Sequence, residues 1–437
     1  MHGRLAALLD TMGPGHARVA ALATAHPGPT LTAATLAALA DTTVATAREV
    51  LATLVAAGAA DERGTATEQA HARYALAGQA RPVLAARADP DDVDRALDRL
   101  AEHYRLRAAA ADVQLNPWRW RADEDGAARA HTAQDQNGGP WFADEGAALG
   151  WVAAELADLA ALATRLAEEG HPAPWWLADH LATALVALKP WEVMATLYRA
   201  GLAAAQDEGH QVATALMLQR VATITDDPDA RKRHLDRALI LYTAAGHHPG
   251  MASALQTLGD HAAQTRDLER AGELYRESID AHRHIGRARG AAISERKLGE
   301  ALARQGRLVD ALALFTRART TLTGLPDADL YQAGRCTQAA AATLLDGDPD
   351  PATLKATEDM LRRSLADAAR GGRIHQQAGM HHQLSRIAAR RGDTAAARAE
   401  LVRARELMEA TGHPDLEQIT QDLHALEDPH HGKDASR

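Results

Sequence analysis

The chain has 437 residues, of which 46% are hydrophobic and only 3% aromatic, and much of the apolar content is alanine. Alanine has the highest helix propensity and lets helices approach closely, so this composition favours stacked helices over β-sandwiches. The formal charge of −10, without a long basic block, argues against a general attraction to nucleic acid or anionic membranes. A single cysteine, Cys336, excludes an internal disulfide framework and a cysteine-based zinc site.

The N-terminus does not have the pattern of a targeting segment. Its apolar stretch is short and is broken by Asp10 and then by Gly13-Pro14-Gly15, which is too soon for a secretory signal. Nowhere does the sequence contain 18 consecutive apolar residues, so we expect no membrane-spanning helix. We therefore expect a cytoplasmic protein.

Residues 1–90 carry the turn and helix signals of a small domain. Pro27-Gly28-Pro29 and Asp41-Thr42-Thr43 separate helical stretches, and Gly58 ends the last of them. The expected helices cover 16–25, 32–40 and 44–57, and the expected wing covers 61–74. This order predicts a degenerate winged-helix-like domain.

Residues 91–137 are expected to form a helical linker, and 138–209 two divergent helix pairs. All seven tryptophans fall between 118 and 191. We interpret them as a buried junction, since each indole brings a large apolar area; an aromatic ligand pocket is the alternative. Residues 123–139 are polar and end near a Gly-Gly-Pro turn, which predicts a loop.

Residues 210–427 contain an internal repeat. Leu258-Gly259 recurs 40 residues later as Leu298-Gly299. Turn residues at the ends of successive units follow mostly the same 40-residue spacing: Gly246, Gly286 and Pro326, and then Gly372 and Gly412. A period of this length is the signature of a helical repeat array.

Each unit is expected to contain two helices, as in 251–264 and 268–284. In the second of these helices Ala271, Tyr275 and Ser278 are spaced by four and then three residues, which puts them on one face. Small residues alternate with large ones there, as close helix packing requires. The units resemble tetratricopeptide repeats (TPRs) in a 40-residue form. The resemblance implies an all-α fold, a right-handed TPR superhelical solenoid with the winged-helix-like domain at its N-terminus.

Three segments upstream of the repeats support a second resemblance. The run from Trp141 to Trp151, Trp-Phe-Ala-Asp-Glu-Gly-Ala-Ala-Leu-Gly-Trp, is distinctive, as are Leu97 to Tyr104 and Leu115-Asn-Pro-Trp-Arg-Trp120. They resemble the segment that opens the repeat region of actinobacterial STAND regulators, the nucleotide-switch proteins with an NB-ARC ATPase. In that family such a segment links a winged helix to the repeats. The resemblance implies a role in signalling, transcriptional control or defence.

The chain departs from that family at its nucleotide-related positions. The wing ends in Arg73-Tyr-Ala-Leu-Ala77-Gly78, where the family has a His-Asp pair that reports on bound nucleotide. A phosphate-binding Gly-x-x-x-x-Gly-Lys-Ser/Thr loop is absent, and the Gly432-Lys433 pair lies in a polar tail. We therefore expect no ATPase, no cofactor and no enzymatic activity. The chain is then the sensor half of such a regulator, acting as an adaptor; whether a separate ATPase subunit is involved stays open.

A DNA-binding role for residues 1–90 is the alternative. The domain has seven Arg and seven Asp or Glu, so it carries no net charge. Specific reading of the major groove normally uses several Arg, Lys, Asn or Gln side chains from one face. The candidate residues here are Thr43, Thr46, Arg48, Arg63 and Arg73. A structural or protein-docking module is favoured over a ligand-gated transcriptional regulator.

The first helix of each TPR pair lines the concave groove, so the residues two before and two after each repeated leucine should face a partner. They are Arg220, Gln256, Asp260, Arg296, Glu300, His382 and Arg386. Because this set mixes both charge signs, it suits a protein or peptide held by charge-assisted hydrogen bonds. A purely structural scaffold with several simultaneous partners is a further hypothesis.

The 22 histidines contain no His-x-x-x-His or His-Glu-x-x-His pattern, so we expect no metal site. Residues 428–437 are polar and are expected to form a disordered tail.

Overall fold

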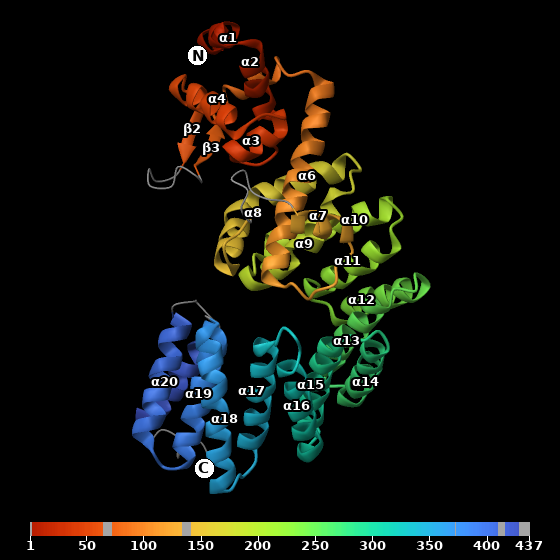
Figure 1. Cartoon of the computed structure of the whole chain (residues 1–437), viewed down its shortest axis with the longest axis vertical. Coiled ribbons are helices and arrows are strands. Elements are labelled where there is room, and N and C mark those ends of the chain that lie inside the picture. Colours follow the sequence, from red (N-terminus) through yellow and green to blue (C-terminus); the bar gives the residue numbers. More distant parts are fainter. Residues whose placement is uncertain (1, 64–71, 133–140, 372, 410–415, 428–437) are drawn as a thin grey trace. The chain divides into compact units, whose positions relative to one another are not determined.

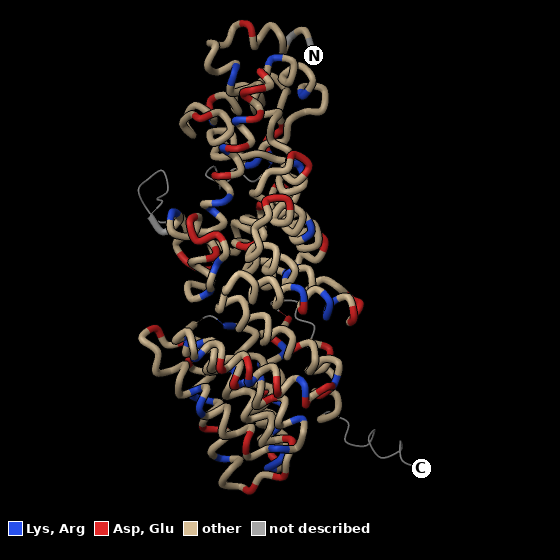
Figure 2. Tube along the Cα trace, turned by 90° about the vertical axis from the view of Figure 1, so that its right-hand side faces the viewer, with Lys and Arg blue, Asp and Glu red and all other residues tan. Residues whose placement is uncertain are grey.

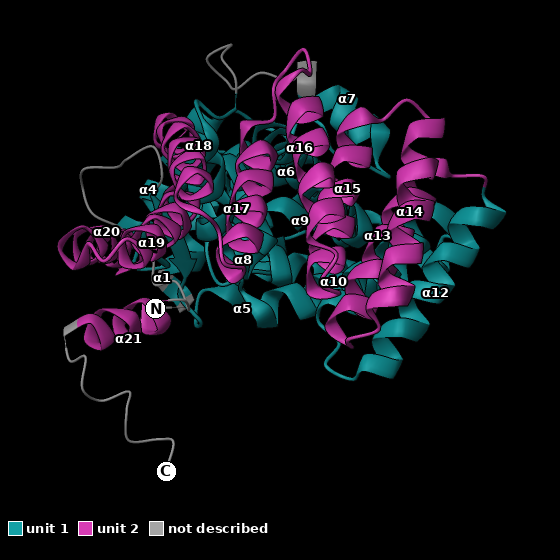
Figure 3. Cartoon of the chain, turned by 90° about the horizontal axis from the view of Figure 1, so that it is seen from below, with its two compact units in different colours: residues 1–245 teal, residues 246–437 magenta. Residues whose placement is uncertain are grey.

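The computed structural model describes residues 2–63, 72–132, 141–371, 373–409 and 416–427 (Figure 1). The predicted disordered tail lies outside the described residues. The chain divides into two compact units, residues 1–245 and residues 246–437 (Figure 3). We call them unit 1 and unit 2. The boundary between the two units falls inside the predicted solenoid of residues 210–427. The limits of the predicted domains remain predictions.

Unit 1 begins with a module that has the element order of a winged helix. Its three strands form an antiparallel sheet in the order β1-β3-β2, in which Tyr74 pairs with Leu31 on one side and Glu62 on the other. Its helices are α1 (His2–Thr11), α2 (Pro14–Leu22), the 3-10 turn η1 (Ala23–Ala25), α3 (Ala33–Ala40), α4 (Val44–Ala56) and α5 (Arg81–Ala85). Its strands are β1 (Leu31–Thr32), β2 (Ala60–Arg63) and β3 (Arg73–Leu76).

Local capping explains where these helices start and stop. Thr32 and Thr35 form a reciprocal capping box at the start of α3. Asp41 ends the same helix in the left-handed region, with φ of 51°, which aspartate tolerates better than most residues. The predicted helices at 32–40 and 44–57 therefore match α3 and α4 within one residue.

Seven further helices complete unit 1. They are α6 (Pro90–Leu115), α7 (Glu124–Thr132), α8 (Glu145–Glu168), α9 (Ala173–Leu188), α10 (Trp191–Asp207), α11 (Gln211–Thr223) and α12 (Pro228–Ala244). Helix α6 packs against both α8 and α9, and so joins the N-terminal module to the helix pairs. The prediction of a loop over 123–139 is wrong for 124–132, which is helical in α7, while 133–140 lie outside the described residues.

The tryptophans of unit 1 do not all share one buried core. Trp175 is 3% exposed, whereas Trp118 and Trp191 are 44% and 59% exposed. Buried charges take much of the interior instead: Asp112 and Asp179 have no exposed surface. The junction is thus held by ion pairs as well as by indole rings.

Helix α8 is the one described helix that is long and apolar enough to cross a membrane, with a mean hydropathy of 1.4 over its best window. Composition alone cannot separate a span from a core helix. Two of its residues, Glu155 and Asp158, are 4% and 1% exposed and are paired with Arg73. These polar contacts are typical of a core helix in a folded domain.

Unit 2 consists of antiparallel helix pairs closed by a single helix (Figure 1). They are α13 (His248–Gln264), α14 (Leu268–His284), α15 (Ala288–Arg304), α16 (Leu308–Thr323), α17 (Leu330–Asp346), α18 (Pro351–Arg370), α19 (Ile374–Arg390), α20 (Thr394–Glu409) and α21 (Leu416–Glu427). The prediction of an all-α TPR fold is confirmed.

The repeated Leu-Gly pair has a steric cause. A Cβ atom on Gly259 would lie 2.6 Å from Cε1 of Tyr275, and one on Gly299 would lie 2.6 Å from Cε1 of Phe315. Each glycine therefore receives the aromatic ring of the second helix in its own pair. Only glycine leaves room for a ring at that distance, so the pattern fixes the packing of each helix pair.

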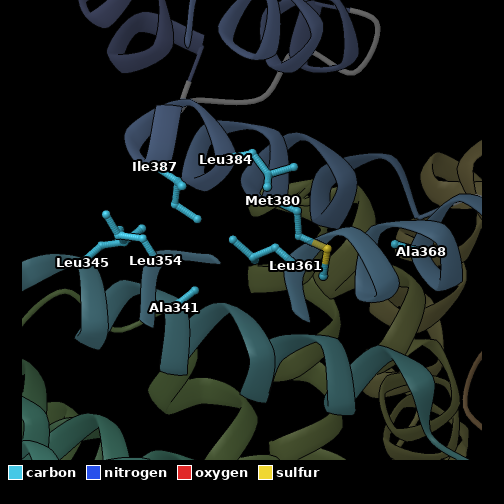
Figure 4. Packing of buried hydrophobic residues seen from close by; sticks show 8 residues of the cluster. All are labelled: Ala341, Leu345, Leu354, Leu361, Ala368, Met380, Leu384 and Ile387. Atoms are coloured by element: carbon cyan, nitrogen blue, oxygen red, sulfur yellow. The ribbon is translucent and has the colours of Figure 1, made fainter. Parts of the chain in front are cut away.

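The later pairs use aliphatic packing in place of the aromatic ring. Figure 4 shows side chains of α17, α18 and α19 meeting in one cluster: Ala341, Leu345, Leu354, Leu361, Ala368, Met380, Leu384 and Ile387. Helix α21 covers the last pair with Ile419 and Leu423, which are 1% and 3% exposed. Terminal repeats need such a cover because their outer apolar face has no following repeat to bury it.

Candidate partner-binding face

The first helices of successive pairs in unit 2 contact one another, α13 with α15, α15 with α17 and α17 with α19. Among the described residues, the second helices of successive pairs make at most marginal contact with one another; each packs instead on the first helix of the next pair. The first helices therefore lie on the inner side of a curved stack. We call the surface formed by Gln256, Asp260, Glu300, His382 and Arg386 the first-helix face; Arg296 was predicted to lie on it as well.

Asp260 is the centre of a three-helix contact on this face. Tyr275 donates from its hydroxyl to Asp260 Oδ1 at 2.7 Å, and Lys297 Nζ lies 2.5 Å from Oδ2. Burial, and then the charge of Asp260, raise the pKa of Tyr275 far above its ordinary value, so the phenol stays a donor. The carboxylate thus ties α13 to α14 and to α15.

Arg296 lies under the first-helix face rather than on it, with 1% of its surface exposed. Its Nη1 pairs with Glu300, one turn along α15, while Nε and Nη2 have no hydrogen-bond partner among the described residues. The Glu300 side chain is 44% exposed. A partner would therefore meet Glu300 before Arg296.

Cys336 on α17 lies within the electrostatic reach of Arg296. Burial raises the pKa of the Cys336 thiol to about 12, an effect that the charge of Arg296 reduces only in part. At this pKa the thiol stays protonated near neutral pH. Cys336 is buried in a cluster with Ala292, Ala318, Leu322 and Ala333.

The remaining candidates of unit 2 also have partners inside the chain. Ser294 donates to Gln256 Oε1 at 3.2 Å. His382 Nε2 lies 2.7 Å from Asp422 Oδ2 on α21. Arg386 Nη2 lies 2.9 Å from Asp346 Oδ1, at the end of α17. The half-buried polar groups of this face are thus oriented by their neighbours before any partner binds.

Arg220 lies in unit 1, on α11, whereas the other six candidates lie in unit 2. Its Nε is buried and has no hydrogen-bond partner among the described residues. Its charge acts on Asp179, where it helps to keep the pKa of that carboxyl below its ordinary value. Arg220 therefore belongs to the charged interior of unit 1.

Sequence reasoning missed the arginines that join consecutive first helices. Arg304 on α15 donates to the carbonyl of Ala263 at the end of α13, at 2.9 Å. Arg390 on α19 donates to the carbonyls of Leu345 and Gly347 at the end of α17. A cation at a helix C-terminus satisfies its last carbonyls and interacts favourably with the helix dipole. Each arginine follows its acceptor by 41 to 45 residues, which is close to the repeat period. That spacing was the sequence signal by which these contacts could have been predicted.

Two of the five DNA candidates act as a helix cap. Thr43 is the N-cap of α4, and its hydroxyl oxygen accepts from the backbone N–H of Thr46 at 3.1 Å. Arg48 is exposed beside the equally exposed Glu49, and Arg63 is exposed at the end of β2. Basic and acidic residues are interspersed over the chain (Figure 2). Among the described residues of this module, only Arg48 and Arg63 of the candidate set are exposed cations, fewer than a groove-reading face normally uses.

Arg73, the fifth DNA candidate, is held by helix α8. Its Nη1 lies 2.8 Å from Glu155 Oε1, its Nη2 pairs with Asp158, and its Nε donates to Thr30 at 2.9 Å. Burial alone would raise the pKa of Glu155, but the hydrogen bond and charge of Arg73 keep it below its ordinary value. Arg73 therefore anchors the wing and is not available to a phosphate or a base.

Metal binding finds no support in the described residues, where no three His, Cys, Asp or Glu side chains gather as a metal ion would require. The adjacent histidines of α19 face different helices: His381 pairs with Glu400 on α20, and His382 with Asp422 on α21.

No family model and no curated protein sequence matches the chain. Among solved structures, BtubC (BKLC) from P. vanneervenii is similar with 17% identity and a TM-score of 0.38, over 61% of this chain and 94% of that one. A STAND protein with a tetratricopeptide repeat sensor from Pyrococcus horikoshii matches at 11% identity and a TM-score of 0.47. That match covers 97% of this chain and 66% of that protein.

A Rap protein complexed with competence and sporulation factor matches at 12% identity and a TM-score of 0.46, over 75% of this chain and 98% of that one. At these values the similarities carry no argument about function.

Proposed function

We propose that this chain is a non-catalytic adaptor or sensor that holds a protein or peptide on the first-helix face of unit 2. The observation that supports the proposal is the row of partly exposed Gln256, Glu300, His382 and Arg386 on the inner side of the stack. Peptide segments present backbone donors and acceptors in alternation. A face that mixes amide, carboxylate, imidazole and guanidinium groups can satisfy both kinds.

The pre-oriented state of these side chains also supports the proposal. Asp260, His382 and Arg386 are each held by a partner on another helix. Ordering a long side chain on binding costs about 0.5–1.5 kcal/mol, and a side chain that is already ordered avoids that cost. The role in bacterial signalling and the cytoplasmic location are part of the same proposal.

The alternative, recognition of DNA by residues 1–90, has weaker support. Thr43, Thr46 and Arg73 already have partners within the chain, and two exposed arginines remain. A mobility-shift assay with genomic fragments at physiological salt tests it. A shift that Arg48→Ala abolishes would favour this alternative over the adaptor.

The adaptor proposal is tested with the immobilised full-length chain and a lysate of the native host. One variant carries Gln256→Ala, Glu300→Ala and Arg386→Ala on the first-helix face. The matched control carries Arg270→Ala, Glu277→Ala and Arg307→Ala on the outer side, where these side chains are about half exposed. Retained proteins are identified by mass spectrometry, and synthetic segments of them are titrated by fluorescence anisotropy.

We expect a retained segment whose affinity falls at least tenfold in the inner variant, since each lost charged hydrogen bond contributes about 1.5–3 kcal/mol. The outer variant should bind like the unmodified chain. Equal binding by all three proteins, with circular dichroism showing that each is folded, would remove the first-helix face as the binding site.

A further inference from the structure

An apolar edge of unit 1 is exposed at the turn between α9 and α10. Every residue of α9 up to Leu185 is buried or half-buried, and the last residues of the helix then emerge from the unit. Val186 and Leu188 are 58% and 36% exposed, and Trp191, the first residue of α10, is 59% exposed. The apolar sequence thus continues past the point where the helix stops being buried.

Trp118 belongs to the same end of unit 1, because α6 and α9 pack side by side and run in the same direction. Two contacts show this register: Arg105 lies over the ring of Trp176, and Thr183 donates to Asp112. Both contacts join residues 71 apart, so the two helices end at the same level. Trp118 follows the end of α6 and is 44% exposed.

We call Trp118, Val186, Leu188 and Trp191 the tryptophan edge. They are four of the five large apolar side chains that are exposed in the described part of unit 1; the fifth, Ile240, is on α12. An indole side chain brings about 150–250 Å² of surface, and burying apolar surface is favourable. A gathering of exposed apolar side chains with a polar rim is typical of an interaction site.

Two residues of opposite charge flank the tryptophan edge. Lys189 ends α9, and Glu192 lies in the first turn of α10. Both are exposed, and neither has an ion-pair partner among the described residues. The rim therefore has no net charge that would attract a strongly acidic or a strongly basic partner. It does have one unpaired charge of each sign.

We propose that the tryptophan edge binds the same edge of a second copy of this chain. In a dimer with twofold symmetry each surface must be complementary to itself. The apolar residues meet this condition because they pack on one another. The rim meets it because Lys189 of either copy can pair with Glu192 of the other. A partner with charges of one sign would leave one of these two residues unpaired.

The small size of the tryptophan edge implies a weak dimer. Stable interfaces bury about 1,200–2,000 Å² in total, and smaller ones belong to transient complexes. We therefore expect a dissociation constant in the micromolar range or above. The edge belongs to unit 1, so the dimer does not depend on the first-helix face of unit 2. A dimer would offer two such faces to a partner with two binding segments, which strengthens its binding through effective concentration.

The test is sedimentation equilibrium of the full-length chain from micromolar to sub-millimolar concentration. We expect a monomer–dimer equilibrium, and a blue shift of tryptophan emission with concentration because Trp118 and Trp191 lose contact with water. Val186→Glu should weaken the dimer at least about tenfold, since it places a charge in an apolar contact. The matched control Val309→Glu changes an 81% exposed valine on α16 of unit 2 and should associate like the unmodified chain.

A charge exchange tests the twofold pairing of the rim. Lys189→Glu and Glu192→Lys each place like charges opposite one another, and each should weaken the dimer about fivefold. The double variant restores opposite charges at both contacts, so it should associate like the unmodified chain. A merely apolar contact would show no such rescue.

Four results would each overturn the proposal once circular dichroism shows that the variants are folded. The first is a chain that stays monomeric over the whole concentration range. The second is equal weakening by Val186→Glu and Val309→Glu. The third is a double charge variant that associates no better than either single one. The fourth is binding to neutral phosphatidylcholine vesicles that Val186→Glu abolishes, which would assign the edge to a lipid surface.

Discussion

Units 1 and 2 are both helical but fill their helix interfaces with different groups. In unit 2 a glycine faces an aromatic ring in successive pairs, as Gly259 faces Tyr275 and Gly299 faces Phe315. In unit 1 the wholly buried carboxylates Asp112 and Asp179 hold Arg119 between them. We infer that periodic packing spreads the stability of unit 2 over many small contacts. The buried ion network concentrates the stability of unit 1 in a few residues.

The two units can be observed separately in solution. All seven tryptophans lie between 118 and 191, so tryptophan fluorescence follows unit 1 alone. Far-ultraviolet circular dichroism follows the helices of both units. A transition seen by dichroism but not by fluorescence therefore belongs to unit 2.

The largest expected effect comes from breaking the ion network of unit 1. Asp112 accepts from Arg119 at 2.8 Å, from Arg121 at 2.6 Å and from Thr183 at 2.7 Å. Asp112→Ala removes the carboxylate that two buried guanidinium groups share, which typically costs about 3–5 kcal/mol because it leaves buried positive charge uncompensated. Arg119 then keeps only Asp179 as a carboxylate acceptor, and Arg121 keeps backbone carbonyls. Urea unfolding followed by tryptophan fluorescence should show this loss.

The control for that experiment is on the same helix. Asp98 is 67% exposed and pairs only with His171, at 3.4 Å. Asp98→Ala should cost less than about 1 kcal/mol, because exposed pairs contribute little. If both substitutions cost the same, the ion network does not hold unit 1 together.

The second prediction concerns the pH dependence of the stability of unit 2. Burial, and then the charge of Arg287, lower the pKa of His282 to about 4, against an ordinary value of 6.5. Below pH 6.5 the unfolded chain therefore binds a proton that the folded chain does not. The stability of unit 2 is unaffected by this group above pH 6.5 and falls between pH 6.5 and 4, by roughly 3 kcal/mol at most.

His282→Gln should remove the loss of stability between pH 6.5 and 4. The measurement is the unfolding of unit 2 followed by circular dichroism at several pH values. The control His284→Gln, which changes an exposed histidine in the same last turn, should leave it unchanged. An identical pH profile for His282→Gln and the unmodified chain would contradict the assignment.

The smallest of the three effects tests the glycine–aromatic contact. A Cβ on Gly299 would meet Phe315 at 2.6 Å, whereas one on Gly272 meets nothing closer than 3.5 Å. Overpacking costs about 1–3 kcal/mol, and alanine recovers up to about 1 kcal/mol through helix propensity. We expect Gly299→Ala to destabilise unit 2 by about 1–2 kcal/mol and Gly272→Ala to stabilise it slightly. Equal effects of the two substitutions on the stability of unit 2 would mean that α15 and α16 can move apart to accommodate the added Cβ without cost.

The sequence predicted the repeats well because their packing is local. The expected helix at 268–284 coincides with α14, and that at 251–264 begins three residues inside α13. The period fixes which residues face the neighbouring helix. It does not fix how deeply they lie, so Arg296, expected on the first-helix face, is buried beneath it.

The non-periodic contacts escaped prediction. Arg73 is a DNA candidate by sequence, yet it lies on strand β3 and its partners Glu155 and Asp158 come 82 and 85 residues later, on helix α8. Helix α7 is short and polar, so its sequence resembles a loop. Contacts of Arg105 with Asp123 and Asp125, at and just inside the start of that helix, hold it against α6. Neither contact has a sequence signal, because each depends on how distant helices meet.

What the sequence alone determined about this protein is its repeat fold, since helix propensity, glycine spacing and the small–large alternation act within one or two helices. The tertiary structure decided which charged residues are available. It buried Arg296, committed Arg73 to α8 and left Nε of Arg107 without a hydrogen-bond partner among the described residues. A charge is neutralised by whatever lies within a few ångströms in space, and that distance is set only when the whole chain has folded.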